Sequence, residues 1–395
     1  MAILVTDGNQ RATLAVVRSL GRKGVSVTIG EAHRQSLAAT SRYCSREFIY
    51  PSPETDPGGF QMALLQYLHA QPHEILLPMT DITRDLAPLA TVALPSPEVF
   101  ARAADKGELL RLAQLQDIPI PRTQFADTVE AVARISPDLT YPVVLKPRQS
   151  RLRTPQGWVH GGVEYAHSPK ELIEKHRKMS AVHAAPLIQE RVVGPGCGVF
   201  GLFTHGIPKA LFAHRRIREK PPSGGVSVLR ESIRLDDRLR EYSCRLMAAL
   251  DWHGVAMVEF KIDQASSVPK LMEVNGRFWG SLQLAIDAGI DFPCLLYQVL
   301  RGEDPAPVGE YRQGIKTRWF LGDLDHLLIM WLHRHGSLSL PVGYPGRWAT
   351  LWEFCKACGP GTRSEIWNRD DPGPAWTELR QYMISGLSGI RSRLT

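Results

Sequence analysis

Two stretches in the middle of the chain alternate apolar and polar residues with a period of two, which is typical of half-buried β-strands. The first, VAMVEFKID, covers residues 255–263, and the second begins LMEVNGR at residue 271. In the second stretch Glu273 and Asn275 are two residues apart, so their side chains point to one face. Arg277 follows on the same face if the strand continues. The pattern therefore predicts two strands that carry a set of charged and amide side chains.

The first of these strands adds Glu259 at a polar position. Carboxylates that are paired on a buried face repel one another and lose their solvation, so such a pair needs a cation. Mg²⁺ prefers oxygen ligands, and it is commonly held by one or two carboxylates together with nucleotide phosphates. We therefore predict that Glu259, Glu273 and Asn275 bind Mg²⁺, or Mn²⁺ in its place. A solvated strand edge with ordinary charges is the alternative that the spacing leaves open.

The beginning of the chain predicts an α/β domain. Residues 2–6 form an apolar run that ends in Asp-Gly-Asn, residues 11–20 show helical spacing, and residues 25–29 are apolar again. A strand–helix–strand opening with glycine at the turn is typical of a doubly wound α/β unit. A formal G-x-G-x-x-G occurs at residues 196–201, but a strand-like run and a turn follow it. That segment therefore predicts a β-hairpin and not a dinucleotide site.

Two lysines stand at the ends of predicted elements. Lys106 follows Asp105 at the entrance of an amphipathic helix that stops before Pro119, and Lys146 ends the apolar run YPVVLK just before Pro147. A cation at the end of a buried strand needs an anionic partner, and a triphosphate supplies one. For Lys106 an ordinary place on a helix surface is the alternative.

Basic residues concentrate in two loop regions. Residues 148–153 open a glycine-containing loop to residue 163, which we predict to be a flexible lid over phosphates. Residues 212–232 carry cations ahead of Pro-Pro-Ser-Gly-Gly, and on a hairpin these could clamp a γ-phosphate and an anionic acyl group. A solvated basic turn is the alternative. The cations of this hairpin are Arg215, Arg216, Arg218 and Lys220.

Composition limits the class of protein. The chain has 395 residues, enough for two or three domains, and a net charge of +7 that forms no stripe, so we expect no nucleic-acid partner. Its longest apolar runs are too short to cross a bilayer, and residues 1–10 contain no basic leader, so we expect a cytoplasmic protein without a membrane partner. Six scattered cysteines indicate reduced thiols, and the single C-x-x-C at Cys355 and Cys358 does not predict zinc.

The sequence EVNGR at residues 273–277, after an acidic strand and before a glycine- and alanine-containing helix, resembles the metal-binding end of the ATP-grasp superfamily. It is most similar to the carbamoyl-phosphate-synthase-like and carboxylate–amine-ligase branches, over residues 1 to about 300. The resemblance implies an α/β chain with α+β lobes in an ATP-grasp fold. The implied parts are a Rossmann-like pre-ATP-grasp domain (1–100), a small lobe with the lid loop (101–185), a large lobe with the metal site (186–305) and a C-terminal extension of unknown role (306–395).

The resemblance also assigns roles to residues. It implies that Lys106 and Lys146 bind ATP phosphates, and that residues 189–192 hold adenine. It implies that Arg277 and the arginine hairpin meet the transferring group. The implied adenine residues are Gln189, Glu190 and Val192, and the implied catalytic residues are Arg277, Arg215, Arg216 and Arg218. In one respect the chain departs from many relatives, because Gly196, Cys197 and Gly198 stand where a ribose-binding glutamate is common.

The function that the resemblance implies is ATP-dependent joining of a carboxylate to an amine through an acyl phosphate, with release of ADP and phosphate. The expected substrates are a small-molecule carboxylate and a small-molecule amine, with amino acids among the candidates. Two alternatives remain open, a bicarbonate-using enzyme of the carboxylase or carbamoyl-phosphate type and a non-catalytic ATP-binding regulatory module. Residues 336–395 contain four tryptophans, which favours packing or a homodimer contact for the C-terminal extension.

Overall fold

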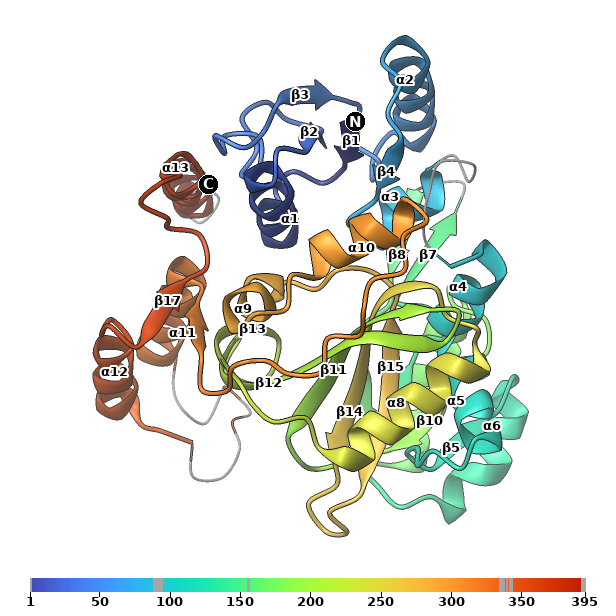
Figure 1. Cartoon of the computed structure of the whole chain (residues 1–395). Coiled ribbons are helices and arrows are strands. Elements are labelled where there is room, and N and C mark those ends of the chain that lie inside the picture. The colour runs from blue at the N-terminus through green and yellow to red at the C-terminus, as the bar shows by residue number, and fades with distance from the viewer. Residues whose placement is uncertain are drawn as a thin grey trace. The chain divides into compact units, whose positions relative to one another are not determined.

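The computed structural model describes residues 2–87, 95–154, 157–333, 338, 340 and 344–391. The chain divides into two compact units, and each is assembled from separate stretches of sequence (Figure 1). The first unit contains Met1–Ala93, Phe212–Arg234 and Arg277–Thr395. The second contains Leu94–Leu211 and Leu235–Gly276.

The first unit begins with a four-stranded parallel sheet in the order β3-β2-β1-β4. Helix α1 follows β1 directly, and its residues from Ala12 to Leu20 are buried, which covers the sheet with the apolar face that the helical spacing predicts. The predicted strand–helix–strand opening is therefore confirmed. The bounds are β1 (Ala2–Val5), α1 (Arg11–Arg22), β2 (Ser26–Glu31), β3 (Arg46–Ile49), α2 (Pro57–Ala70), β4 (Ile75–Leu77) and α3 (Asp81–Leu86).

The rest of the first unit, as far as the structure describes it, is a second set of strands with five helices. The long strand β12 begins in the second unit and ends in the first, where it pairs antiparallel with β13. Strand β16 pairs antiparallel with β13 and parallel with β17. The bounds are β12 (Ile207–Lys220), β13 (Val226–Ser232), α9 (Leu282–Ala288), α10 (Phe292–Leu300), β16 (Lys316–Arg318), α11 (Phe320–Leu332), α12 (Arg347–Lys356), β17 (Thr362–Ser364) and α13 (Gly373–Arg391).

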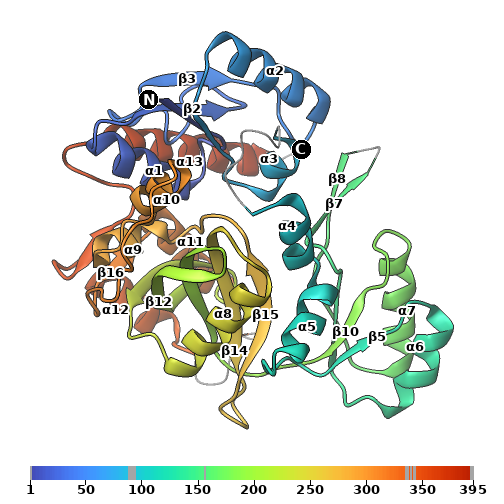
Figure 2. The same ribbon diagram turned by 45° about the vertical axis from the view of Figure 1, so that its right-hand side comes forward.

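One part of the second unit is an antiparallel sheet in the order β5-β10-β6-β9. Helices α6 and α7 lie side by side on this sheet (Figure 2), and apolar residues of β6, β9, β10, α6 and α7 form one buried cluster. The bounds are β5 (Thr123–Phe125), α6 (Val129–Ile135), a 3₁₀ turn (Ser136–Asp138), β6 (Val143–Lys146), β9 (Glu164–Ala166), α7 (Pro169–Ser180) and β10 (Leu187–Glu190).

The other part of the second unit contains the two strands with acidic residues. Strand β14 pairs antiparallel with β11 on one side and with β15 on the other. The G-x-G-x-x-G segment forms β11, which a turn connects to β12, so the predicted hairpin is confirmed. The loop predicted as a lid contains the antiparallel pair β7 and β8. The bounds are α4 (Pro97–Ala104), α5 (Lys106–Leu115), β7 (Arg151–Thr154), β8 (Gly157–His160), β11 (Gly196–Thr204), α8 (Asp237–Ala249), β14 (Gly254–Ile262) and β15 (Pro269–Asn275).

Within the described part of the chain, none of the helices combines the length and the apolar character that crossing a bilayer requires.

Candidate functional site

Three of the predicted ligands meet on the β14–β15 ladder of the second unit. Glu259 and Glu273 are directly opposite one another in the antiparallel register, and Met257 is opposite Asn275. Residues opposite one another in such a ladder project to the same face at close range. The side-chain amide of Asn275 lies between the two acids, with Nδ2 at 3.4 Å from Oε1 of Glu259 and 3.3 Å from Oε1 of Glu273. The structure therefore brings Glu259, Glu273 and Asn275 together.

Lys106 adds a cation to this group. Its side chain is buried, and Nζ lies 3.4 Å from Oε2 of Glu273 while donating a hydrogen bond of 2.7 Å to the hydroxyl of Ser150. The backbone N–H of Lys106 donates to the carbonyl of Arg148 at 2.9 Å. The backbone and the ammonium group of Lys106, at the start of α5, are thus both hydrogen-bonded to residues just before the β7–β8 hairpin.

Asp105 positions the turn that carries Lys106. Its carboxylate caps the N-terminus of α5 by accepting from the N–H groups of Gly107 at 2.8 Å and Glu108 at 3.0 Å. The same carboxylate accepts from Nε of Arg148 at 2.9 Å. An aspartate directly before a helix is a recognisable capping signal, so this role was readable from the sequence. The contribution of Ser150 was not, because nothing in the local pattern of the loop connects it to α5.

Lys146 ends β6 and is half-buried. Burial is the main cause that lowers its pKa, to about 8, and the neighbouring charges of Lys106 and Lys261 lower it further, while Glu273 and Glu259 act in the opposite direction. Among the described residues the side chain of Lys146 has no hydrogen-bond or ion-pair partner. The charged form of such a partly buried lysine is stabilised when an anion binds to it.

The charges around Glu273 keep it ionised. Burial alone raises the pKa of its carboxyl, but the positive charge of Lys106, the amide of Asn275 and the charge of Lys146 together lower the pKa below its ordinary value. An ionised carboxylate is the form that coordinates a divalent cation.

The donor set of this site fits Mg²⁺ that is shared with a nucleotide. Among the described residues no group of three or more His, Cys, Asp and Glu side chains could hold a metal ion by itself. The β14–β15 ladder supplies two carboxylates and the side-chain amide of Asn275, and it would leave the remaining positions of an octahedral ion to phosphate oxygens and water.

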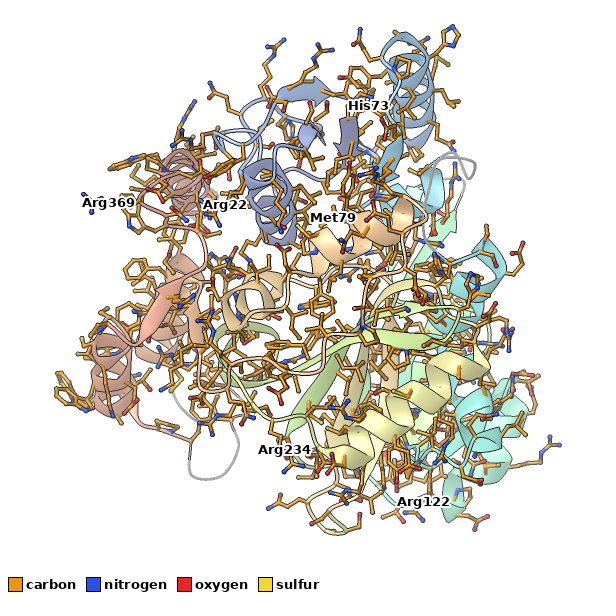
Figure 3. The ribbon with its side chains drawn as sticks, in the orientation of Figure 1. Arg22, His73, Met79, Arg122, Arg234 and Arg369 are labelled. Atoms are coloured by element: carbon orange, nitrogen blue, oxygen red, sulfur yellow. The ribbon has the colours of Figure 1, made fainter. Side chains whose placement is uncertain are left out.

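The residues predicted for adenine lie on β10 and just after it. The side chain of Gln189 is buried and donates to Thr123 at 2.9 Å. That of Glu190 forms ion pairs with Lys270 at 2.5 Å and with Arg122 at 2.8 Å. Figure 3 labels Arg122. Val192 is buried. Since the two polar side chains have protein partners, the predicted adenine contacts would fall to backbone groups and to apolar surface.

Gly194 shapes the segment that follows. Its φ is +151°, and a Cβ atom at this position would lie 1.8 Å from the carbonyl oxygen of Ile262. Only glycine tolerates both the positive φ and the close approach of this carbonyl oxygen. The chain after β10 is consequently held against the end of β14, where the N–H of Ile262 also donates to the carbonyl of Pro195 at 3.0 Å.

The predicted catalytic arginines belong to the first unit, and each has an acidic partner there. Two of them use long-range partners: Arg277 pairs with Asp81 at 3.1 Å, and Arg218 makes two hydrogen bonds of 2.6 Å to Asp323. Arg218 is also buried, so a structural role explains its contacts, and its catalytic role stays a prediction. The two remaining arginines have local partners, Glu231 at 2.5 Å for Arg215 and Glu219 at 3.0 Å for Arg216.

Comparison with known proteins identifies the fold. The model of one protein family, described as "ATP-grasp in the biosynthetic pathway with Ter operon", matches residues 208–322. A search of curated proteins finds no match.

Solved structures match a much larger part of the chain. Biotin carboxylase from Campylobacter jejuni, in a β-γ-ATP complex, matches with a TM-score of 0.64 at 15% identity. The match covers 80% of this chain and 74% of the biotin carboxylase chain. L-amino acid ligase from Bacillus licheniformis has a TM-score of 0.56 at 17% identity, with 76% and 74% covered. N5-carboxyaminoimidazole ribonucleotide synthetase from Thermus thermophilus has a TM-score of 0.59 at 16% identity, with 80% and 81% covered. The predicted ATP-grasp fold is therefore confirmed.

Proposed function

Because this chain has the ATP-grasp fold, we propose that it is an ATP-dependent carboxylate–amine ligase with the site on β14 and β15 as its nucleotide and metal site. One observation carries the proposal. Glu259 and Glu273 oppose one another on adjacent strands, with Nζ of Lys106 3.4 Å from Glu273 and with Lys146 close enough to lower the pKa of the same carboxyl. Two acids for a cation and two lysines for phosphates are what binding of a nucleotide with its metal ion requires.

The proposed roles of the side chains in this site are electrostatic, because they bind charged groups and fix their positions. Lys106 and Lys146 bind phosphate oxygens of ATP, and Glu259, Glu273 and Asn275 hold Mg²⁺. The ion would neutralise negative charge on the phosphates when bound. Phosphoryl transfer depends chiefly on such positioning and charge neutralisation, so no side-chain nucleophile is needed.

The proposed reaction has two steps. A carboxylate oxygen of the acid attacks the γ-phosphorus of ATP, which forms an acyl phosphate and releases ADP. The amine then attacks the acyl carbon, phosphate leaves, and the amine nitrogen loses a proton to give the amide. Arg277 and the hairpin arginines Arg215 and Arg216 are proposed to bind the anionic groups in these steps.

The test is ADP release from ATP and Mg²⁺ with a panel of acid–amine pairs, amino acids included. We expect release that requires both an acid and an amine, and loss of release in Glu273→Ala. A bicarbonate requirement, with no dependence on an organic acid, would move the assignment to the carboxylase or carbamoyl-phosphate class. ATP binding without ADP release for any pair would favour a regulatory module.

A matched control separates loss of the site from loss of the fold. Glu241 lies on α8 and pairs with Arg245 one turn away on the same helix, so Glu241→Ala removes a carboxylate of the second unit outside the proposed site. We expect Glu241→Ala to keep the release rate of the wild type and Glu273→Ala to unfold at a similar denaturant concentration. Equal loss of activity in both variants would contradict the assigned role of Glu273.

A further inference from the structure

Two glycines open one face of β11 beside the proposed nucleotide site. Strands β11 and β14 pair antiparallel (Figure 1), with Gly196 directly opposite Lys261 and Gly198 directly opposite Glu259. Residues that oppose one another in such a ladder project to the same face. At these two positions β11 therefore adds no side chain to the face, and a Cβ atom at Gly196 would have nothing within 4 Å. The space across from Lys261 is open.

Lys261 lies on the same face of β14 as the proposed metal ligand Glu259. The two residues are two positions apart, and the pairing of β14 with β11 is regular over this stretch. Phe260, which stands between them in the sequence, is buried and points to the other face. The sequence did not single out Lys261, but strand geometry turns its side chain toward the site.

The ammonium group of Lys261 is near both ends of the proposed nucleotide site. Its Nζ donates to the carbonyl of Val192 at 3.4 Å, in the segment predicted to hold adenine. Burial is the main cause that lowers the pKa of Lys146, and the charge of Lys261 lowers it further, so the two lysines are close together. Lys146 is proposed to bind phosphate. A ribose joins the base to the phosphates, and its place in the site is therefore beside Lys261.

We propose that Lys261 binds the ribose of the nucleotide by donating a hydrogen bond to a hydroxyl oxygen. This inference rests on the proposed function, because it assumes that a nucleotide binds here. An ammonium group has three donors, so the bond to Val192 does not exclude one to the sugar.

The proposed contact explains how the chain departs from the proteins that it resembles. Gly196, Cys197 and Gly198 stand where a ribose-binding glutamate is common among them. A carboxylate accepts from a hydroxyl hydrogen, whereas an ammonium group donates to the hydroxyl oxygen. In this chain the side chain that contacts the sugar comes from the opposite strand of the ladder and has the opposite charge.

The test compares ADP with 2′,3′-dideoxy-ADP, which lacks both hydroxyl oxygens, by calorimetric titration with Mg²⁺ into the full chain at pH 7.5. In the wild type we expect ADP to bind about tenfold more tightly, because the analogue loses a hydrogen bond to a charged donor. In Lys261→Met this preference should fall below about twofold. A preference that persists in Lys261→Met, or that is absent from the wild type, would overturn the role of Lys261.

Two further variants separate the hydrogen bond from other effects of the substitution. Lys261→Arg keeps a charged donor and should keep most of the preference for ADP; loss of the preference there too would contradict a role as donor. Lys178 is exposed on α7 and pairs with Glu174 one turn away, so Lys178→Met removes a positive charge outside the site. It should bind both nucleotides as the wild type does. An equal loss of preference in Lys178→Met and Lys261→Met would contradict a local contact.

Failure of this role and failure of the proposed function give different results. If neither nucleotide binds to the wild type, the site on β14 and β15 does not hold a nucleotide, and both proposals are wrong. If ADP binds and Glu273→Ala weakens both nucleotides alike, but Lys261→Met leaves the preference unchanged, only the role of Lys261 is wrong. The preference is a ratio within one variant, so partial loss of folded protein does not alter it.

Discussion

If Lys146 binds nucleotide phosphates as proposed, the lowered pKa of its side chain makes nucleotide affinity depend on pH in a calculable way. With a pKa of about 8, roughly three quarters of the free protein carries the proton at pH 7.5 and roughly a tenth carries it at pH 9.0. A phosphate oxygen favours the charged lysine, so the nucleotide-bound protein keeps the proton over this range. At pH 9.0 the lysine must therefore take up a proton from the solvent when the nucleotide binds. This linkage predicts a dissociation constant for Mg·ADP that rises about eightfold from pH 7.5 to pH 9.0.

The assay is calorimetric titration of Mg·ADP at both pH values at constant ionic strength. ADP replaces ATP so that no turnover occurs, and its phosphates are fully ionised throughout the range. In two buffers of different ionisation heat the titration also reports proton uptake, which should approach one proton per nucleotide at pH 9.0.

Lys146→Arg is the matched control, since a guanidinium stays charged at both pH values. Its affinity should be nearly independent of pH, and Lys146→Met should be weak at both. Wild-type affinity that does not change with pH would refute the reasoning. So would an equal pH dependence in Lys146→Arg, because the titrating group would then lie elsewhere.

Three further variants test other parts of the structure. Glu273→Gln should weaken Mn²⁺ binding in the presence of ADP about tenfold, by electron paramagnetic resonance, through loss of an ionised ligand; unchanged affinity would remove Glu273 from the metal site. Asp323→Asn should lower the free energy of unfolding in urea by about 3–5 kcal/mol, because two buried guanidinium groups lose their counter-ion; a change under 1 kcal/mol would mean that the cluster is compensated otherwise. Gly194→Ala should weaken Mg·ADP binding, since its Cβ collides with the carbonyl of Ile262, while Gly196→Ala, with nothing within 4 Å, should not; equal affinities would show that the segment relaxes without cost.

The local pattern of the sequence predicted the elements well because the signals are local. Residues 255–263 alternate, and β14 runs Gly254–Ile262; residues 11–20 show helical spacing, and α1 runs Arg11–Arg22. Lys106 was predicted at the entrance of an amphipathic helix, and α5 begins at Lys106. The boundaries differ by one or two residues because the ends depend on caps and turns more than on periodicity.

The grouping of the candidate site was predicted in part. Spacing by two places Glu273 and Asn275 on one face, but only strand pairing puts Glu259 opposite Glu273. The predicted lysines and acids lie in one compact unit, and the predicted arginines lie in the other. Nothing in local periodicity specifies that Arg218 pairs with Asp323, because the two residues are 105 positions apart. The sequence likewise did not indicate that Ser150 holds Lys106.

The sequence by itself determined the strand and helix periods, the position of each charge along the chain and the resemblance to ATP-grasp proteins. Only the tertiary structure decided which of these charges are compensated. A period places a side chain on a face of its own element, whereas the energy of a buried charge depends on what other elements bring within a few ångströms of it. That difference left the side chain of Lys146 near Glu273 and Glu259 but without a direct ion pair among the described residues, and it placed Arg318, which the sequence did not single out, beside an apolar cavity.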